Sequence, residues 1–553
     1  MLECSGFFEA PMSPLFHGPT PSGAGYRRCS VTAPGAVPYH WSVPNPWWKD
    51  AVVYQIYPRS FLDTDGDGVG DLEGVRRQLE HLVWLGVDAL WLSPVFRSPM
   101  ADFGYDVSDY CDIDPVFGDL AALDALVADA HALGLRVILD WVPNHSSDQH
   151  PWFADSRAAP DSEHRNWYVW RDSGPGGGPP NNWIRSWSDQ PAWTYDDASD
   201  QWYLHCFLPE QPDVNWAEPA LEAAMLDVLR FWLDRGIDGF RMDVIHLIGK
   251  DPDLPDDPPE LAAISHVPLN DRPETHVLLR RMRKLLDGYP DERMAVGEVY
   301  LLDTGAVATY LGHNDELHLA FNFPPMFAKW DAAKWRRQIE IAAAEHDPLG
   351  AWPTWVLSNH DNRRQASRYG SEARARAAAV MLLTLRGTPF LYAGEELGLE
   401  DAVVPDDRLV DPGGRDGCRA PIPWDATPSH GWPTADPWLP WPPDADSRNV
   451  AAQRDDPDSI LHLYRRVLGA RRSSPALHAG LVTLLDDLPT GVLGYERRSG
   501  DDRRVVLINF TDAAIEVGTD GTSSVEVSTH AGSDGAVFSG LLAPDQAAIL
   551  RPT

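Results

Sequence analysis

Short apolar runs recur along residues 52 to 396, and the segments between them have the spacing of amphipathic helices. Each run has the length of a buried strand. Eight runs occur: VVYQIYP (52–58), ALWLSP (89–94), RVILDWV (136–142), GFRMDV (239–244), MAVGEV (294–299), LHLAFNF (317–323), WVLSNHD (355–361) and TPFLYAGEE (388–396). Eight strands that alternate with helices close a parallel barrel. The sequence therefore predicts an α/β fold, a (β/α)8 TIM barrel.

Other stretches depart from this pattern. Residues 145–215, rich in Trp, Asp, Pro and Gly, are too long for one connecting helix and predict an inserted subdomain over the barrel mouth. Short β-rich runs near the end predict a C-terminal antiparallel β-sandwich. We expect an irregular N-terminal extension, a barrel in two segments, the insert and the sandwich, at residues 1–45, 46–144 with 216–470, 145–215 and 471–553.

The charge and the cysteines of the chain limit which partners and which cellular compartment are expected. The formal net charge is 46 − 82 = −36, which disfavours nucleic acid and anionic membrane surfaces as partners. No apolar run approaches the ~20 residues of a membrane span, and residues 1–45 lack the pattern of a signal peptide. The cysteines are scattered without CxxC spacing, which predicts a reducing cytoplasm: Cys4, Cys29, Cys111, Cys206 and Cys418. We expect a cytoplasmic monomer or small homo-oligomer.

Carboxylates end several of the predicted strands. Asp243, Glu298 and Asp361 close three of them, and the carboxyl ends of barrel strands meet at one mouth. Taken alone, each is most simply a strand cap or half of a local ion pair, such as Asp243 with Arg241. Gathered together, they repel one another and raise at least one pKa, which is how a general acid stays protonated near neutrality.

The residues around these carboxylates resemble the α-amylase superfamily, glycoside hydrolase family 13, in its α-glucosidase and oligo-1,6-glucosidase branch. The resemblance covers about residues 46 to 550. It is carried by DWVPNH (140–145), QPDVN (211–215), GFRMDV (239–244), GEV (297–299) and SNHD (358–361). QPDVN is close to the form typical of the oligo-1,6-glucosidase branch.

The resemblance implies hydrolysis with retained anomeric configuration. It makes Asp243 the nucleophile, Glu298 the general acid and then base, and Asp361 the residue that holds the sugar O2 and O3 hydroxyls. Arg241 would orient Asp243 and keep it ionised while Glu298 stays protonated. His145 lies in a motif and is implied as a ligand of the sugar hydroxyls, as is His360.

Two further segments resemble those that close the pocket in α-glucosidases. GYDVSDY (104–110) and GGRDGCR (413–419) imply that Asp106 and Arg415 bind the non-reducing glucose. A pocket blocked in this way admits only a chain end, so the enzyme is expected to be exo-acting. The alternative interpretation of the two residues is a surface salt bridge.

DTDGDGVGD (63–71) has alternating carboxylates and glycines, an oxygen-rich spacing suited to Ca²⁺ or Mg²⁺. It also matches the metal loop that follows the first strand in this branch. The predicted ligands of a structural ion are Asp63, Asp65, Asp67, Val69 and Asp71. A solvated turn is the simpler alternative. No organic cofactor is expected.

We therefore predict an exo-acting, retaining α-glucosidase that releases glucose from short oligosaccharides of the maltose and isomaltose type, with transglucosylation left open. Val244, next to the nucleophile, accompanies α-1,6 preference in this branch, although simple strand packing is the alternative. Of the many tryptophans, only those in the insert, such as Trp152 and Trp183, are candidates for the site. The alternatives are a sucrose hydrolase, a sucrose isomerase or a transglucosidase, then an endo-acting amylase or a non-catalytic binding subunit.

Overall fold

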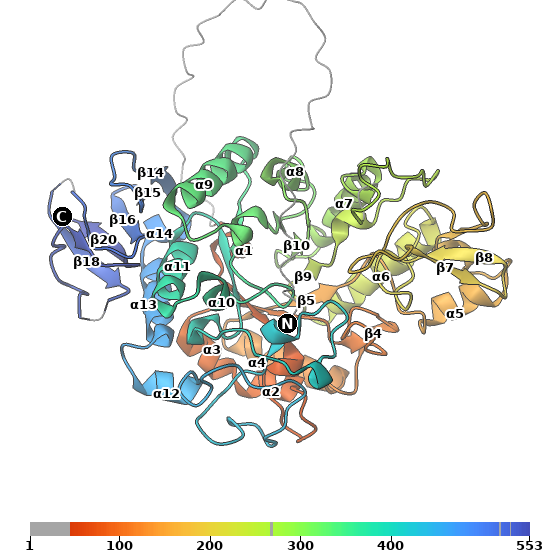
Figure 1. Cartoon of the computed structure of the whole chain (residues 1–553), viewed down its shortest axis with the longest axis horizontal. Helices are drawn as coiled ribbons and strands as arrows, with labels where there is room; N and C mark the ends of the chain where they lie inside the picture. Colours follow the sequence, from red (N-terminus) through yellow and green to blue (C-terminus); the bar gives the residue numbers. More distant parts are fainter. Residues whose placement is uncertain (1–44, 266–268, 519–520, 531) are drawn as a thin grey trace, which may run out of the picture. The chain divides into compact units, whose positions relative to one another are not determined.

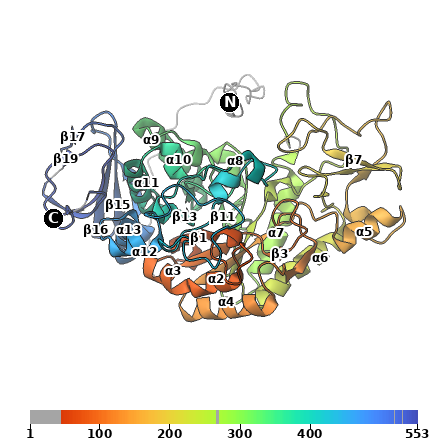
Figure 2. The ribbon, with the colours of Figure 1, turned by 60° about the horizontal axis from the view of Figure 1, so that its bottom comes forward.

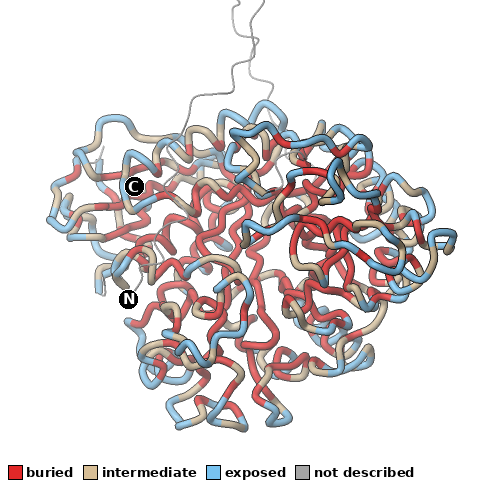
Figure 3. Tube along the Cα trace, turned by 45° about the vertical axis from the view of Figure 1, so that its right-hand side comes forward, coloured by how far each residue is buried: buried red, intermediate tan, exposed pale blue. Residues whose placement is uncertain are grey.

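The computed structural model describes residues 45–265, 269–518, 521–530 and 532–553. Of the predicted N-terminal extension, residues 1–45, only residue 45 is described, and residues 1–44 lie outside this description. Residues 45–553 form one compact unit. Within it, buried segments run through the middle and exposed segments lie in the surrounding loops (Figure 3).

Eight parallel strands form the central sheet, in the order β11-β10-β9-β5-β2-β1-β13-β12. Three of them, β5, β9 and β10, are labelled next to one another in Figure 1. The hydroxyl of Thr354 joins the two ends of the sheet, because it donates to the carbonyl of Ala320 (2.8 Å) and accepts from the amide of Asn322 (3.0 Å). The predicted parallel barrel is confirmed. Its strands are β1 (Val53–Ile56), β2 (Ala89–Leu92), β5 (Arg136–Trp141), β9 (Gly239–Met242), β10 (Met294–Gly297), β11 (Leu319–Ala320), β12 (Thr354–Val356) and β13 (Thr388–Tyr392).

The strands are shorter than the apolar runs that predicted them. β9 ends at Met242 and β10 at Gly297, each one residue before a carboxylate. Each of these two strands is buried along its whole length, as a sheet covered on both faces must be. The polar residue after each strand leaves the hydrogen-bonding ladder and enters the mouth of the barrel.

Helices surround the barrel, and α2, α3, α4 and α6 lie along one side of it in Figure 2. Several begin at an acidic or hydroxyl side chain that accepts from a backbone amide three residues later, as Asp119 does for Ala122 and Ser459 for His462. The helices are α1 (Trp47–Asp50), α2 (Leu72–Arg77), α3 (Leu79–Leu85), α4 (Leu120–Ala132), α6 (Pro219–Asp234), α7 (Pro273–Leu286), α8 (Thr304–Thr309), α9 (Ala332–His346), α10 (Gln365–Tyr369), α11 (Glu372–Thr384), α12 (Val450–Asp455), α13 (Ile460–Ser473) and α14 (Pro475–Ala479).

The segment between β5 and β9 has structure of its own. It contains α5 (Pro151–Ala158) and a three-stranded antiparallel sheet of β6 (Trp170–Arg171), β8 (Gln201–Leu204) and β7 (Trp193–Asp196). A second small sheet pairs β3 (Phe96–Arg97) with β4 (Asp109–Ile113). Asn182 of the insert hydrogen-bonds to both Asp256 and Asp257, so the insert also contacts the long loop after β9.

The C-terminal segment forms a five-stranded antiparallel sheet and a separate two-stranded one. Buried Arg471 of α13 and Arg497 of β15 each donate to backbone carbonyls at or just beyond the end of α11, which ties this sheet to the barrel helices. The strands are β14 (Leu481–Leu484), β15 (Val492–Ser499), β16 (Asp502–Asn509), β20 (Ala547–Pro552) and β18 (Ser523–Ser528), then β17 (Ile515–Glu516) with β19 (Leu541–Leu542).

Within the described part of the chain, Cys111, Cys206 and Cys418 form no disulfide, while Cys4 and Cys29 lie outside it. Among the helices of the described segments, none combines the length and apolarity needed to cross a bilayer.

Candidate active site

Three carboxylates lie just beyond the carboxyl ends of neighbouring or nearby barrel strands. Asp243 follows β9, Glu298 follows β10, and Asp361 lies in the loop after β12. Asp243 and Glu298 are buried, at 5% and 7% exposure, whereas a quarter of the Asp361 side chain is exposed. The structure therefore places all three at the mouth that the sequence predicted.

Arg241 links two of these carboxylates. Its Nη1 donates to Oδ1 of Asp243 (2.6 Å) and to Oδ1 of Asp140 (2.7 Å), and its Nη2 donates to Oε2 of Glu298 (2.6 Å). The sequence predicted the contact with Asp243 but not the other two. One buried guanidinium thus serves three carboxylates, and the four groups would carry a net charge of −2 if all were ionised.

Burial makes that charge unfavourable. It raises the pKa of Asp140 to about 7. It also raises the pKa of Asp243, with Arg241 opposing the shift and the neighbouring carboxylates Glu298 and Asp140 adding to it. The cluster therefore retains a shared proton near neutral pH. Arg241 favours ionised Asp243, as expected from the sequence, but it does not set that ionisation alone.

Val244 has an unusual backbone for a β-branched residue, with φ of +34°. In this conformation its amide donates to Oε2 of Glu298 (3.1 Å), the same oxygen that Arg241 contacts. The side chain is half-buried against a cluster that includes Trp183 and Leu247. Local strain of this kind is found where a site requires one backbone geometry.

Asp361 is held by two arginines. Its Oδ1 accepts from Arg415 Nη1 (3.0 Å) and from Arg419 Nη2 (3.1 Å), and its Oδ2 lies 3.3 Å from His360 Nε2. Burial alone would raise the pKa of Asp361, but the positive charges of Arg415 and Arg419 outweigh it and hold that pKa below its ordinary value. Asp361 is therefore an ionised acceptor.

Asp106 and Arg415 were both expected to bind the non-reducing glucose, but the carboxylate that faces Arg415 in the structure is that of Asp102. Arg415 Nη2 donates to Oδ1 of Asp102 (2.5 Å), which lies four residues before Asp106 in the chain. Asp106 accepts from the hydroxyl of Ser98 and from the amides of Ala101 and Asp102, so its carboxylate is used within its own loop. Asp102 lies opposite Arg415, and Asp106 positions Asp102.

The two predicted histidines are both fully buried. His360 Nδ1 lies 2.7 Å from Gln55 Nε2, and its Nε2 lies 2.5 Å from the hydroxyl of Tyr105, whose ring stacks on the imidazole. Burial lowers the pKa of His360 to about 3, so the ring is neutral. His145 Nε2 lies 3.2 Å from Gln211 Nε2, within the QPDVN segment.

Lys250 is a site residue that the sequence did not reveal. Its buried Nζ contacts Oδ2 of Asp213 (2.8 Å) and Oδ1 of Asn144 (2.6 Å), so one ammonium joins the QPDVN and DWVPNH segments. Lys250 lies in a loop without a strand or helix pattern. Only its position soon after the GFRMDV motif could have drawn attention to it.

Aromatic residues of the insert divide into packing and exposed groups. Trp183 is buried and donates to the carbonyl of Pro255, and Trp152 packs on Trp167. Trp187, which the sequence analysis did not single out, is 46% exposed at φ of +57°. The guanidinium of Arg415 lies 4.6 Å from the centre of its ring. Trp187 therefore reaches the candidate site from the insert.

The Asp-rich loop brings three carboxylates together. Oxygens of Asp63, Asp65 and Asp71 lie within 4.8 Å of one another, a donor set that fits a hard divalent cation. This group does not include Asp67, whose Oδ1 accepts from the amide of Val69 (2.7 Å).

Comparison with known proteins agrees with this site. Residues 55–480 match the family model for the alpha-amylase catalytic domain. The chain is 42% identical to a probable alpha-glucosidase of Rhizobium meliloti (strain 1021), covering 85% of this chain and 90% of that protein. It is 36% identical to an oligo-1,6-glucosidase of Parageobacillus thermoglucosidasius, over 84% and 91%. The crystal structure of the alpha-glucosyl transfer enzyme XgtA superposes with a TM-score of 0.85 at 38% identity, over 92% and 100%. The chain therefore belongs to the alpha-amylase family of glycoside hydrolases.

Proposed function

We propose that this enzyme is an exo-acting, retaining α-glucosidase that releases glucose from the non-reducing ends of short α-glucosides. The observation that carries the proposal is how Arg241 and Val244 hold two carboxylates. Their contacts use Oδ1 of Asp243 and Oε2 of Glu298. Each carboxylate then offers its second oxygen to a substrate, one as nucleophile and the other as acid.

In the first step, Oδ2 of Asp243 attacks the anomeric carbon and forms a β-glucosyl ester as the glycosidic C–O bond breaks. The proton on Oε1 of Glu298 moves to the leaving oxygen. In the second step, Glu298 takes a proton from water, the water oxygen attacks the anomeric carbon, and Asp243 leaves. Two inversions retain the α-configuration.

The pocket for the terminal glucose rests on Arg415. Its guanidinium joins Asp102 to Asp361, and both carboxylates remain acceptors for sugar hydroxyls. We infer that this bridge closes the pocket beyond the non-reducing end, so that an internal glucose of a longer chain cannot enter. The sequence predicted exo-action with Asp106 at the closed end of the pocket. We assign that place to Asp102.

Azide rescue tests the catalytic roles directly. In Asp243→Ala, azide takes the place of the nucleophile, attacks the β-face, and is expected to give β-glucosyl azide. In Glu298→Ala, azide attacks the glucosyl enzyme from the α-face and is expected to give α-glucosyl azide. Glu516→Gln, on an exposed strand, is the control and should behave as wild type. The opposite pair of products would refute the assignment.

Chain-end action has its own test. A maltooligosaccharide should shorten by one glucose at a time, and the same sugar with its terminal O4 and O6 blocked by an ethylidene group should resist. Cleavage of the blocked sugar would mean that the pocket is open at that end. That result would favour endo-action without affecting the azide experiment.

Glucosyl transfer is the second candidate, favoured by the likeness to a protein described as an alpha-glucosyl transfer enzyme. It uses the same carboxylates and differs only in whether water or a sugar hydroxyl attacks the intermediate. Product analysis on maltose, isomaltose and sucrose separates the outcomes. Free glucose without new oligosaccharides supports hydrolysis, whereas new disaccharides without net glucose release support transfer or isomerisation.

We also propose that Asp63, Asp65 and Asp71 hold a structural Ca²⁺ or Mg²⁺, which would neutralise three clustered carboxylates. A cytoplasmic location is proposed on the scattered cysteines. Fractionation of the producing cells, with activity followed in each fraction, tests that location.

A further inference from the structure

Asp411 is a buried carboxylate to which the proposed mechanism gives no role. It lies in the irregular loop after β13, four residues before Arg415, and its side chain is fully buried. Its Oδ2 accepts from the amide (2.7 Å) and from Nε (2.9 Å) of Arg415, and its Oδ1 accepts from Nη2 of the same residue (2.7 Å). Both oxygens therefore contact one edge of the guanidinium, the paired geometry in which carboxylate and arginine bind most strongly.

Other N–H groups of Arg415 reach the proposed glucose pocket. Its Nη1 donates to Asp361 (3.0 Å), and its Nη2 also donates to Asp102 (2.5 Å). Because a guanidinium is planar and rigid, a contact that fixes its Nε edge also fixes where these two nitrogens lie. Asp411 thus determines how Arg415 is turned toward the two carboxylates that are proposed to bind the terminal glucose.

Arg419 connects Asp411 to Asp361 a second time. Its Nη1 donates to Oδ1 of Asp411 (3.0 Å) and its Nη2 to Oδ1 of Asp361 (3.1 Å). Burial alone would raise the pKa of Asp411, but the hydrogen bonds of Arg415 and the charges of both arginines hold that pKa below its ordinary value. Asp411 is therefore an ionised group behind the two arginines, whereas a quarter of the Asp361 side chain is exposed.

The turn that contains Asp411 is shaped for its contact with Arg415. In DPGGR (411–415), the amide of Gly414 donates to the carbonyl of Asp411 (3.1 Å), and Gly414 has φ of +72°, which favours glycine. A Cβ atom at Gly413 would lie 2.9 Å from Nε of Arg415 and 3.2 Å from Oδ2 of Asp411. Both glycines thus allow the carboxylate and the guanidinium to meet within one turn.

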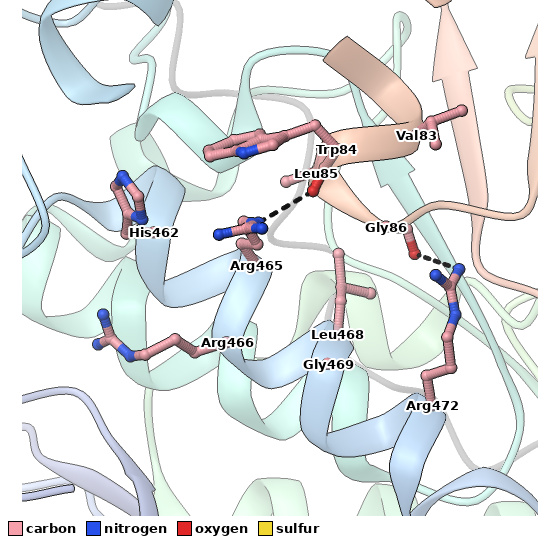
Figure 4. A pocket seen from close by; sticks show the side chains of 10 residues that line it. All are labelled: Val83, Trp84, Leu85, Gly86, His462, Arg465, Arg466, Leu468, Gly469 and Arg472. Carbon is pink, nitrogen blue, oxygen red and sulfur yellow. Dashed lines mark hydrogen bonds between the residues drawn. The ribbon is translucent and has the colours of Figure 1, made fainter. Parts of the chain in front are cut away.

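Arginines beside another pocket have a different task. The pocket of about 390 Å³ between α3 and α13 is flanked by Arg465 and Arg472 (Figure 4). They donate to the carbonyls of Trp84 (3.1 Å) and Gly86 (3.2 Å), which satisfies backbone groups at the end of α3. The side chain of Arg415 instead donates to three carboxylates. Since buried ion pairs contribute little net stability, folding alone does not explain this cluster.

We propose that Asp411 is a positioning residue that holds Arg415, and together with Arg419 also Asp361, in the orientation that receives the terminal glucose. The proposal rests on the proposed function, whose glucose pocket it completes. Asp411 itself does not contact the sugar. Without its charge the two arginines can turn, whereas Arg241 still holds the two catalytic carboxylates. The loss should therefore fall on recognition of the sugar hydroxyls.

The test compares kcat/KM for an aryl α-glucoside with that for its 3-deoxy analogue, which lacks one of the hydroxyls expected to contact Asp361. Wild type should strongly prefer the complete sugar, because the analogue leaves a polar group of the site unpaired. Asp411→Asn should reduce this preference at least about tenfold. Asp407→Asn, at an exposed position of the same loop, is the matched control and should keep the wild-type preference.

A double-mutant cycle tests whether Asp411 acts through Arg415. In an Arg415→Met background, Asp411→Asn should reduce the preference by less than about threefold, because the guanidinium that it positions is gone. Gly413→Ala keeps every charge but crowds the pair, and it should also lower the preference. It decides the question if Asp411→Asn does not fold.

An unchanged preference in folded Asp411→Asn would overturn the proposal even if kcat/KM falls, because a purely structural loss affects both sugars alike. Losses that multiply in the cycle would also overturn it, since Asp411 would then act independently of Arg415. The azide products identify the nucleophile and the acid whatever Asp411 does. Either result would therefore leave the catalytic assignment standing.

Discussion

Replacing Val244 with threonine tests what selects the linkage. The two side chains have nearly the same shape, and both are β-branched, so the strain at φ of +34° is unchanged. The amide still donates to Oε2 of Glu298, and the catalytic acid keeps its orientation. The substitution therefore changes one chemical property, by placing a hydroxyl where a methyl group stood, at a position that the proposed function puts beside the leaving sugar.

The size of the effect follows from that exchange. The side chain is half-buried beside Trp183 and Leu247, where a new hydrogen bond to the leaving sugar is worth about 0.5–1.5 kcal/mol. This corresponds to about 2- to 12-fold in kcat/KM. If valine favours α-1,6 bonds because it cannot make this bond, the ratio of kcat/KM for isomaltose to that for maltose should fall by this factor.

The assay compares kcat/KM for maltose, isomaltose and an aryl α-glucoside, whose leaving group carries no sugar hydroxyl. The aryl substrate should change less than about twofold, because its leaving group offers no sugar hydroxyl for the new threonine to contact. Val244→Ile is the control, since it stays apolar and should keep the wild-type ratio. An unchanged ratio in Val244→Thr would refute the argument. An equal fall for all three substrates would place the effect on the parts of the site that they share, the nucleophile and the glucose pocket, instead.

Three further changes test other parts of the site. Asp140→Asn removes a negative charge from the cluster, which lowers the pKa of the carboxyl group that carries the shared proton. The alkaline limb of the pH–rate profile should therefore move to lower pH by up to about one unit. If the limb does not move, Asp140 does not influence the catalytic proton. Trp187→Ala removes the ring stacked on Arg415 and should raise KM by about 3- to 30-fold with little change in kcat, and Trp187→Phe should recover much of the loss. Calcium should raise the melting temperature by a few degrees in wild type and in Asp67→Ala but not in Asp65→Ala, because only Asp65 belongs to the carboxylate group and alanine offers the ion no side-chain oxygen; equal responses would refute that ligand set.

Local pattern was sufficient to predict the barrel. A parallel strand covered on both faces must be apolar along its length, so each strand left a continuous run such as RVILDWV in the sequence. The positions of Asp243, Glu298 and Asp361 at the barrel mouth were predictable for a related reason. Each interrupts or ends an apolar run, and strand ends converge in this fold wherever they lie in the chain.

Contacts between loops, in contrast, are not marked by any hydrophobic pattern in the sequence. Asp102 and Asp106 are both acidic and four residues apart, and only the tertiary fold determines which one faces Arg415, more than 300 residues later. Trp187 and Lys250 lie in irregular segments where no periodicity marks a direction for the side chain. Sequence located these loops near the mouth, but their side-chain partners depend on long-range packing.

Arg241 shows how the site differs from the rest of the core. A buried ion pair is a weak source of stability, because the cost of removing both charges from water offsets most of their attraction. Around Arg241 the cost of desolvation exceeds the attraction by more than in a simple ion pair, because one guanidinium faces three carboxylates. The buried cluster must therefore keep a proton. An apolar side chain at this position would pack without that cost. What it could not do is hold Asp243 and Glu298 with one oxygen each turned toward a substrate, so the charged cluster is better explained by catalysis than by folding.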